Sequence, residues 1–388
     1  MRNATLVGIF AVFVLALASP FLALHYLWDR EPWHAEHVTL VDYSVPFEDA
    51  REHAGAIWLL NHEKYPPPSG EQWERLGSHV GYDPRDGEPP SRIASQDLSD
   101  TDWLYVTDSY GVYEGDLAGT ESQNASSDFS RLIFGGVSEL DAQAIARFAD
   151  GGGHLFFEFN VLESPTGGRA RAILQDLLGV RWTGWTGRVF ETLYDPSDVP
   201  AWLPRLFRAR FGPDARLPTG PTLVLVHADG RMLLIPNPDL RAAAPSIVLT
   251  VRGRQVLPSA RSGVGYFYWF PILTADAGTE LLAELVLPET DAETSQRLAA
   301  ARIPRRIPML TRRIVNGSHR IYVAGDLADV SFAPRWYGFK YAADARRLAE
   351  SNPERSNPET AFWGFYAPAF RQLLREPFDG PAAAPTPR

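Results

Sequence analysis

Three acidic residues each follow directly on an apolar run, a pattern typical of the ends of buried parallel strands. They are Asp42, Asp108 and Glu158, and the runs before them are 38–41, 103–107 and 154–157. In an open α/β sheet, ligands bind outside the carboxyl ends of the strands. Carboxylates that meet there can act as a general acid and base, or accept hydrogen bonds from sugar hydroxyls. We therefore take these three acids as candidate catalytic residues of a hydrolase.

Polar residues beside the three acids are candidate ligand-binding groups at the same sheet edge. They are Tyr43, Ser109, Tyr110 and Asn160. A fourth apolar run, 320–324, leads to Asp326 and is expected to add one more acid. Strand-end Asp and Asn residues also commonly cap the following helix or pair with arginine. Both interpretations remain open at the level of the sequence.

The segment 181–188, RWTGWTGR, combines two indoles with two arginines, and we expect it to form a loop after a helix. Trp182 and Trp185 can stack on pyranose faces, and Arg188 can bind a carboxylate or phosphate. We place this loop at the rim of the expected cleft. In the alternative interpretation, both indoles pack into the core.

Several classes of function are excluded or lack their signature. The chain has 388 residues and no cysteine, which removes disulfides and thiol nucleophiles. Its formal net charge of −10 argues against a nucleic-acid partner, which requires a basic surface. There is no HExxH, P-loop or GxSxG motif, and His34 and His37 lie in a polar linker where we expect solvent exposure. We predict no metal site and no cofactor.

The elements that must position these residues alternate as strands and helices in the first half of the chain. Helices are expected from Phe47 to Tyr65, from Ser138 to Gly151 and from Ser164 to Leu178. This alternation with continuous apolar strands predicts a parallel sheet covered on both faces. The second half predicts an antiparallel β insertion at about 218–270, then a helix from Asp276 to Leu287. Residues 38–375 are expected to form one α/β domain, followed by a disordered tail at 376–388.

Residues 1–28 are expected to anchor the chain in a membrane. Leu6 to Leu27 is an almost uninterrupted apolar run, and about 20 such residues span a bilayer as a helix. Arg2 precedes the run, and the positive-inside rule then puts the body, after a linker at 29–37, outside the cytoplasm. We expect a single-pass protein of the inner membrane with its body in the periplasm or extracellular space. A signal peptide cleaved after Ala18 is the alternative, because Ala16-Leu17-Ala18 matches an A-x-A site.

The order of elements from Ser138 to Leu178 resembles a known fold: a helix, a GGG turn, an apolar strand, a polar elbow and a second helix. It is similar to the class I glutamine amidotransferase-like fold, in particular to its trehalose-utilisation-type and other non-catalytic members. The resemblance implies a flavodoxin-like parallel sheet. Active members carry a cysteine nucleophile at the elbow, where this chain has Glu158-Phe159-Asn160. Without a thiolate, amidotransferase activity by that route is excluded.

Segments such as DWLYVTDSYGVYEGD, GGGHLFFEFNVLESPT and RIYVAGDLADV resemble a group of membrane-anchored bacterial proteins. This second resemblance covers roughly Val38 to Leu374 and implies an anchor but no particular activity. Two hypotheses follow. The chain is a non-catalytic extracytoplasmic domain that binds an envelope or exported glycan or a partner protein, or it is a carbohydrate-active hydrolase that uses Asp42, Asp108 and Glu158.

Overall fold

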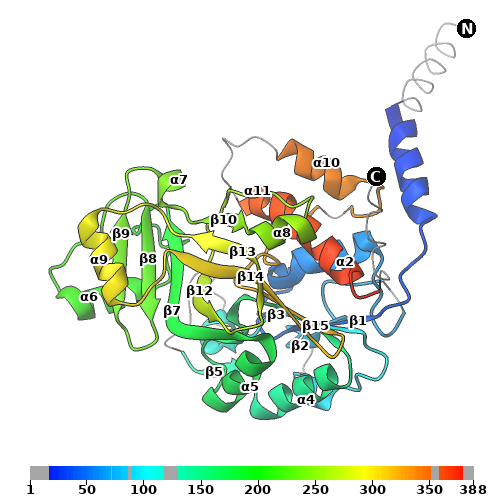
Figure 1. Ribbon diagram of the computed structural model, residues 1–388, viewed down its shortest axis with the longest axis horizontal. Coiled ribbons are helices and arrows are strands. Elements are labelled where there is room, and N and C mark those ends of the chain that lie inside the picture. Colours follow the sequence, from blue (N-terminus) through cyan, green and yellow to red (C-terminus); the bar gives the residue numbers. More distant parts are fainter. Residues whose placement is uncertain are drawn as a thin grey trace, which may run out of the picture.

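A nine-stranded mixed sheet forms the centre of the protein, and helices lie on both of its sides (Figure 1). The computed structural model describes residues 17–70, 72–85, 90–117, 130–334, 336–350 and 358–378. The strand order of the large sheet is β11-β10-β13-β14-β15-β6-β3-β1-β2. Its β15-β6-β3-β1-β2 half is parallel, and its β11-β10-β13-β14 half is antiparallel. The predicted α/β fold with a large sheet that contains parallel strands is therefore confirmed.

The strands of the large sheet have the following bounds: β1 Val38–Asp42, β2 Val80–Gly81, β3 Trp103–Asp108, β6 His154–Glu158, β10 Ser246–Leu249, β11 Val264–Gly265, β13 Glu280–Val286, β14 Arg306–Val315 and β15 Ser318–Val323. A four-stranded antiparallel sheet has the order β12-β7-β8-β9. Its strands are β7 Val180–Phe190, β8 Thr222–His227, β9 Met232–Pro236 and β12 Phe270–Ala275. A small hairpin pairs β4 Val112–Tyr113 with β5 Leu132–Phe134.

The helices are these: α2 Ala54–Glu63, α3 Glu114–Leu117, α4 Glu139–Asp150, α5 Gly168–Leu178, α6 Trp202–Phe211, α7 Leu240–Ala243, α8 Val251–Val256, α9 Ala292–Ala300, α10 Ala342–Ala349, α11 Pro358–Ala361 and α12 Ala367–Arg375. Short 3₁₀ turns are η1 Arg51–His53, η2 Ile93–Ser95 and η3 Phe159–Val161, and a π-helical turn, η4 Phe362–Tyr366, joins α11 to α12. Residues 17–29 form a further helix that projects from the body, dark blue in Figure 1. Within the described ranges, no helix is long and apolar enough to cross a membrane.

The parallel strands form because their sequences can be buried on both faces. β1 is buried at every position, and β3 and β6 are buried at nearly every position. Helices α4 and α5 lie together on one side of the sheet, while α2 and α12 lie on the other (Figure 1). One apolar core runs from Val38 in β1 to Leu374 in α12.

Two elements differ from the sequence prediction. The helix expected from Asp276 to Leu287 is strand β13, which pairs with β10 and β14. The loop expected at 181–188 is the middle of β7, which pairs with β8 and β12. In both cases the sheet partners, rather than the local sequence, decide the conformation.

The antiparallel strands also extend beyond the interval 218–270. They begin with β7 at Val180 and continue through β14, and they belong partly to the separate four-stranded sheet and partly to the large one. The predicted tail at 376–388 begins with an ordered residue, because Glu376 forms an ion pair with the buried Arg312. Residues 379–388 and residues 1–16 of the expected anchor lie outside the described ranges.

Candidate functional site

The carboxyl ends of the parallel strands bring the predicted acids to one edge of the sheet. Asp42 at the end of β1 lies opposite Asp108 at the end of β3. β6, which ends at Glu158, is the next strand, and Val323 of β15 lies opposite Glu158. The turn after β15 then carries Asp326 and Asp329 past the same edge. Burial raises the pKa of both Glu158 and Asp326, and the charge of Asp108 adds to each shift.

Asp42 is completely buried and its carboxylate is fully engaged. One oxygen accepts from the backbone N–H of Ser44 at 2.8 Å, and the other lies 2.8 Å from Nδ1 of His53. The opposite ring nitrogen of His53 lies 2.6 Å from the carbonyl oxygen of Arg75, so both imidazole nitrogens face acceptors. Asp42 therefore ties η1 to the end of β1 and has no surface to offer a ligand.

Glu158 is also buried, at 1% exposure, and three donors saturate it. One oxygen accepts from the hydroxyls of both Tyr105 and Tyr366, and the other accepts from the backbone N–H of Ala328 at 3.2 Å. The two tyrosine hydroxyls are themselves 2.5 Å apart. Burial raises the pKa of Glu158 to about 8, although the hydrogen bond from Tyr105 opposes the shift. We call Asp42 and Glu158 the inner acids.

Asp108, Asp326 and Asp329 remain half-buried at the same edge, and we call them the outer acids. Burial is the largest cause that raises the pKa of each of them. The charge of Asp42 adds to the shift at Asp108, and the charge of Asp329 adds to the shift at Asp326. Raised pKa values mean that these carboxyl groups hold protons more readily than carboxyls in water.

Tyrosines and arginines surround the outer acids. Burial and the charges of Asp329 and Asp326 raise the pKa of Tyr268 above its ordinary value, while Arg51 and Arg188 oppose the shift. The Arg51 guanidinium lies 2.7 Å from a carboxylate oxygen of Asp329. The site thus combines carboxyl groups with raised pKa values, phenol rings and a guanidinium.

A second tyrosine pair lies beside Asp108. The carboxylate of Asp108 accepts from the backbone N–H of Tyr110 at 2.8 Å, and the ring of Tyr110 lies 5.1 Å from that of Tyr113. Burial and the charge of Asp108 raise the pKa of Tyr113 to about 12. The backbone of the predicted residue Tyr110 therefore lies at Asp108, and the residue is half-buried.

Tyr43, Ser109 and Asn160 lie near the edge, but other contacts engage them. The Tyr43 hydroxyl accepts from the backbone N–H of Ile93 at 3.0 Å, so this side chain turns away from the outer acids. The Ser109 hydroxyl donates to the carbonyl oxygen of Asn160 at 3.0 Å, and both residues are buried. The side-chain oxygen of Asn160 has no hydrogen-bond partner in the described part of the chain.

The backbone between Glu158 and Asn160 forms a strained turn. Phe159, between Glu158 and Asn160, has a φ of 35°, which is unfavourable for a residue with a Cβ atom. The hydroxyl of Tyr322 donates to the carbonyl oxygen of Phe159 at 2.5 Å and fixes the turn from β15. The polar elbow expected from the sequence is therefore present as a tight backbone turn, but its side chains are buried.

The predicted loop that carries the two indoles is wrong, because both tryptophans are part of β7. The guanidinium of Arg171 lies 4.9 Å from the ring of Trp182, whose indole N–H donates to the carbonyl oxygen of Trp185 at 2.9 Å. Trp185 is buried, 5.0 Å from the ring of His227. Arg188 forms an ion pair with Asp198, yet its charge still acts on Tyr268 near the outer acids.

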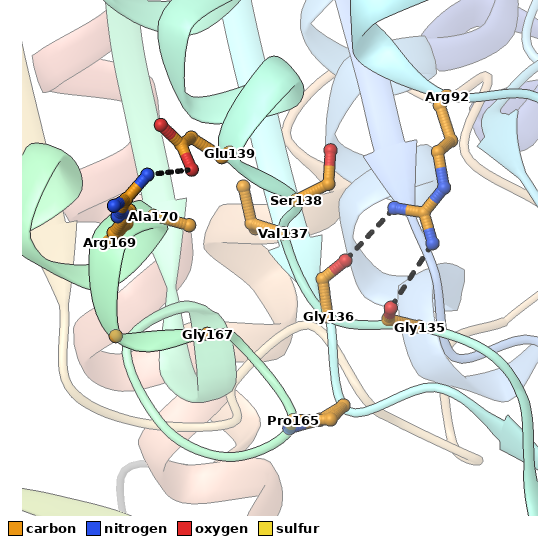
Figure 2. Close-up of a pocket in the computed structure, with 11 residues that line it drawn as sticks. Arg92, Gly135, Gly136, Val137, Ser138, Glu139, Pro165, Gly167, Arg169 and Ala170 are labelled. Carbon is orange, nitrogen blue, oxygen red and sulfur yellow. Dashed lines mark hydrogen bonds and ion pairs between the residues drawn. The ribbon is translucent and has the colours of Figure 1, made fainter.

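A separate cavity of about 390 Å³ opens between the N-termini of α4 and α5 (Figure 2). Its guanidinium groups are occupied. Arg92 donates to the carbonyl oxygens of Gly135 and Gly136 and pairs with Asp141, and Arg169 pairs with Glu139. No residue predicted for the site lines this cavity, and its charges are already neutralised from within the protein.

Sequence reasoning missed several members of the site. Asp329, Arg51 and Glu52 do not follow a strand directly, and Tyr268 lies between β11 and β12. Burial and the charges of Asp329 and Asp42 raise the pKa of Glu52 well above its ordinary range, which places Glu52 in the same group. The spacing of Asp326 and Asp329 after the β15 run was the one signal in the sequence. In the described ranges, no group of three or more histidines and acids is arranged to hold a metal ion.

Comparisons with known proteins return only distant likenesses. No protein-family model and no curated protein matches the chain. An exo-β-1,4-mannosidase from Opitutaceae bacterium strain TAV5 matches at 12% identity and a TM-score of 0.34, over 87% of this chain and 36% of its own. A ThuA-like protein from Bacteroides uniformis ATCC 8492 matches at 9% identity and 0.37, over 85% and 98%. The carbohydrate deacetylase Agd3 matches at 9% identity and 0.33, over 86% and 32%.

The chain thus spans about a third of the length of the mannosidase and of the deacetylase. At TM-scores this low, the likenesses carry no argument about fold or chemistry. The function is therefore inferred from the side chains of the chain itself.

Proposed function

We propose that this chain is a membrane-anchored, extracytoplasmic, non-catalytic domain that binds an envelope or exported glycan at the outer acids. The proposal rests on the contrast between the inner and outer acids at the carboxyl edge of the sheet. The inner acids Asp42 and Glu158 are buried and saturated by donors of the protein, whereas Asp108, Asp326 and Asp329 remain half-buried beside tyrosine rings.

The chemistry of the outer acids fits a neutral, hydroxyl-rich ligand. A carboxyl group accepts hydrogen bonds from sugar hydroxyls, and its protonated form also donates one. Phenol rings such as those of Tyr110 and Tyr268 offer apolar faces with a polar tip, the combination that suits sugar rings. A cation would have to compete with Arg51 at Asp329, and an anion would meet the neighbouring acids. A protein partner with exposed hydroxyl or amide groups is the alternative occupant.

One observation supports the alternative function, a hydrolase. Asp108 is half-buried and its pKa is raised, as is required of a general acid near neutral pH. Its strand-end partners Asp42 and Glu158 are both bound by internal donors, so neither is placed to serve as a base or nucleophile. The geometry therefore favours binding over hydrolysis.

The anchor and the finer fold are parts of the same proposal. The described helix 17–29 continues the apolar run from Leu6 to Leu27, and Leu17, Phe21 and Leu22 are each more than half exposed. This supports a single-pass inner-membrane anchor with the body in the periplasm or extracellular space. The parallel half of the sheet and the strained elbow at Phe159 support a flavodoxin-like fold of amidotransferase-like type without its nucleophile.

A glycan screen tests the proposal. Full-length protein in lipid nanodiscs is applied to an array of bacterial envelope and exported glycans, beside Asp326→Ala and the control Asp229→Ala. Asp229 lies in a surface hairpin with its side chain 52% exposed. We expect wild type and the control to bind the same glycan, and Asp326→Ala to lose it. The proposal fails if wild type binds no glycan, or if the bound glycan is cleaved.

A further inference from the structure

An aromatic segment far along the chain packs against the side of the N-terminal helix. Residues 336–341, WYGFKY, meet helix 17–29 along its length. The ring of Phe339 lies 6.5 Å from that of Phe21, edge to face, and the ring of Tyr337 lies 5.8 Å from that of Trp28. The contact therefore covers two turns of the helix.

Polar contacts fix the same arrangement. Nδ1 of His25 lies 2.7 Å from the carbonyl oxygen of Gly338, and the backbone N–H of Lys340 donates to the carbonyl oxygen of Leu24 at 3.0 Å. These bonds fix the position of the aromatic segment along the axis of the helix.

The body holds the other side of the segment. Nδ1 of His62, in α2, donates to the carbonyl oxygen of Tyr337 at 2.8 Å, and the indole N–H of Trp28 donates to the carbonyl oxygen of His62 at 3.0 Å. The ammonium of Lys340 pairs with Glu31. The segment, the helix and the body are therefore joined by directed bonds.

Two aromatic side chains of the segment are exposed. Trp336 is 68% exposed and Tyr341 is 58% exposed. Tyr26 of the neighbouring helix is 60% exposed. Tryptophan and tyrosine, with lysine beside them, are the side chains enriched at the interface between bilayer and water.

The position of this contact along the helix places residues 336–341 relative to the membrane. If Leu6 to Leu27 spans the bilayer, Leu27 marks the outer boundary of the hydrocarbon. Phe21 then lies about 9 Å deeper, because each helical residue adds about 1.5 Å along the axis. The ring of Phe339 lies 6.5 Å from that of Phe21 and 5.8 Å from that of His25, so it is carried below this boundary, and the ring of Trp336 is 6.2 Å from it.

We propose that residues 336–341 form a second membrane contact that inserts into the outer leaflet of the bilayer beside the anchor helix. This inference rests on the proposed membrane anchor. The segment fixes the orientation of the body, because the bilayer then holds it at two places instead of one.

The absence of cysteine from the chain allows a clean test with single spin labels. Trp336→Cys, Tyr341→Cys and the control Leu140→Cys are labelled with a nitroxide in the full-length protein and reconstituted into phosphatidylcholine–phosphatidylglycerol vesicles. Leu140 is 67% exposed on α4, which lies across the sheet from α2 and α12 (Figure 1). Oxygen partitions into lipid and a nickel chelate stays in water, so their relative accessibilities report depth.

We expect the labels at 336 and 341 to be several times less accessible to the nickel chelate than the label at 140, and more accessible to oxygen. Equal nickel accessibility at all three positions, in protein that resists carbonate extraction from the vesicles, would overturn the inference and leave the anchor standing. Release of the protein by carbonate would instead overturn the anchor. Shielding from both reagents would indicate a protein partner or a second copy on this surface and would also overturn the inference.

Discussion

The inner and outer acids lie at the same edge of the same sheet, yet the fold uses them differently. Asp42 and Glu158 are fully buried, and every donor around them comes from the protein. Asp108, Asp326 and Asp329 keep part of their surface and stand beside tyrosine rings. Position at a strand end therefore does not by itself make a functional residue. The difference is burial, because the inner acids are at most 1% exposed whereas the outer acids keep part of their surface.

Asp42→Ala should destabilise the protein most. This substitution leaves His53 and the Ser44 amide buried without their acceptor, and we expect a loss of about 3–5 kcal/mol in the free energy of unfolding. Chemical denaturation of the full-length protein in detergent measures it. Asp150→Ala is the matched control, because Asp150 is an exposed residue whose ion pair with Arg320 should contribute about 0–1 kcal/mol. Equal losses for the two variants would contradict the structural role of Asp42.

Glu158→Ala should follow with a loss of about 2–4 kcal/mol, since it removes the acceptor of three buried donors. The loss is expected to be smaller than for Asp42→Ala because the hydroxyls of Tyr105 and Tyr366 remain bonded to each other. Glu139→Ala, which breaks a surface pair with Arg169, serves as its control. A Glu158→Ala protein as stable as wild type would show that Glu158 does not stabilise the fold.

The raised pKa of Glu158 predicts how stability depends on pH. The folded protein holds this proton up to a pKa of about 8, whereas the unfolded chain releases it near the ordinary value of 4.5. The contribution is therefore fully present below pH 4.5 and is lost as the pH rises to about 8, at up to about 1.4 kcal/mol per pH unit.

Glu158→Gln isolates this contribution, because an amide does not titrate. The unfolding free energy of wild type minus that of the variant should decrease between pH 4.5 and pH 8 and stay constant above. Denaturation curves for both proteins at several pH values measure this difference. A difference that does not change with pH would mean that Glu158 titrates normally in the folded state.

Among these substitutions, Asp326→Ala should have the smallest effect on the free energy of unfolding. Its main effect should be to weaken ligand binding. Asp326 is half-buried beside other acids, so its removal relieves repulsion while it exposes little apolar surface. We expect the free energy of unfolding to change by less than about 1 kcal/mol. Thermal unfolding followed by circular dichroism checks this. A loss as large as that for Asp42→Ala would move Asp326 into the group of inner acids.

The strand ends could be predicted from the sequence because a continuous apolar run followed by an acid is typical of a buried parallel strand. Val38 to Val41, Trp103 to Thr107 and His154 to Phe157 lie in the parallel half of the sheet, as predicted. The burial of Asp42 could not be predicted, because it depends on His53, which reaches it from η1 through tertiary packing. Asp329 and Tyr268 were missed for the same reason.

The two wrong secondary-structure predictions also have a physical cause. Residues 280–286, ELLAELV, consist mostly of good helix formers, yet they form β13 because β10 and β14 pair on either side. In the segment 181–188, two glycines indicated a turn, but Gly187 lies within a paired strand, where a Cβ would meet the ring of Phe270 at 2.6 Å. Glycine there provides room for a neighbouring ring in place of a change in chain direction.

The outer acids are proposed to bind a neutral glycan that the protein does not cleave. The most direct test is calorimetric titration of full-length wild type, Asp326→Asn and Asp326→Ala with the glycan selected by the array. We expect Asp326→Ala to weaken binding at least tenfold, about 1.4 kcal/mol, while Asp326→Asn retains most of the affinity because an amide also donates and accepts. Equal affinity for all three proteins, or a shortened glycan recovered from the calorimeter, would contradict glycan binding without cleavage at the outer acids.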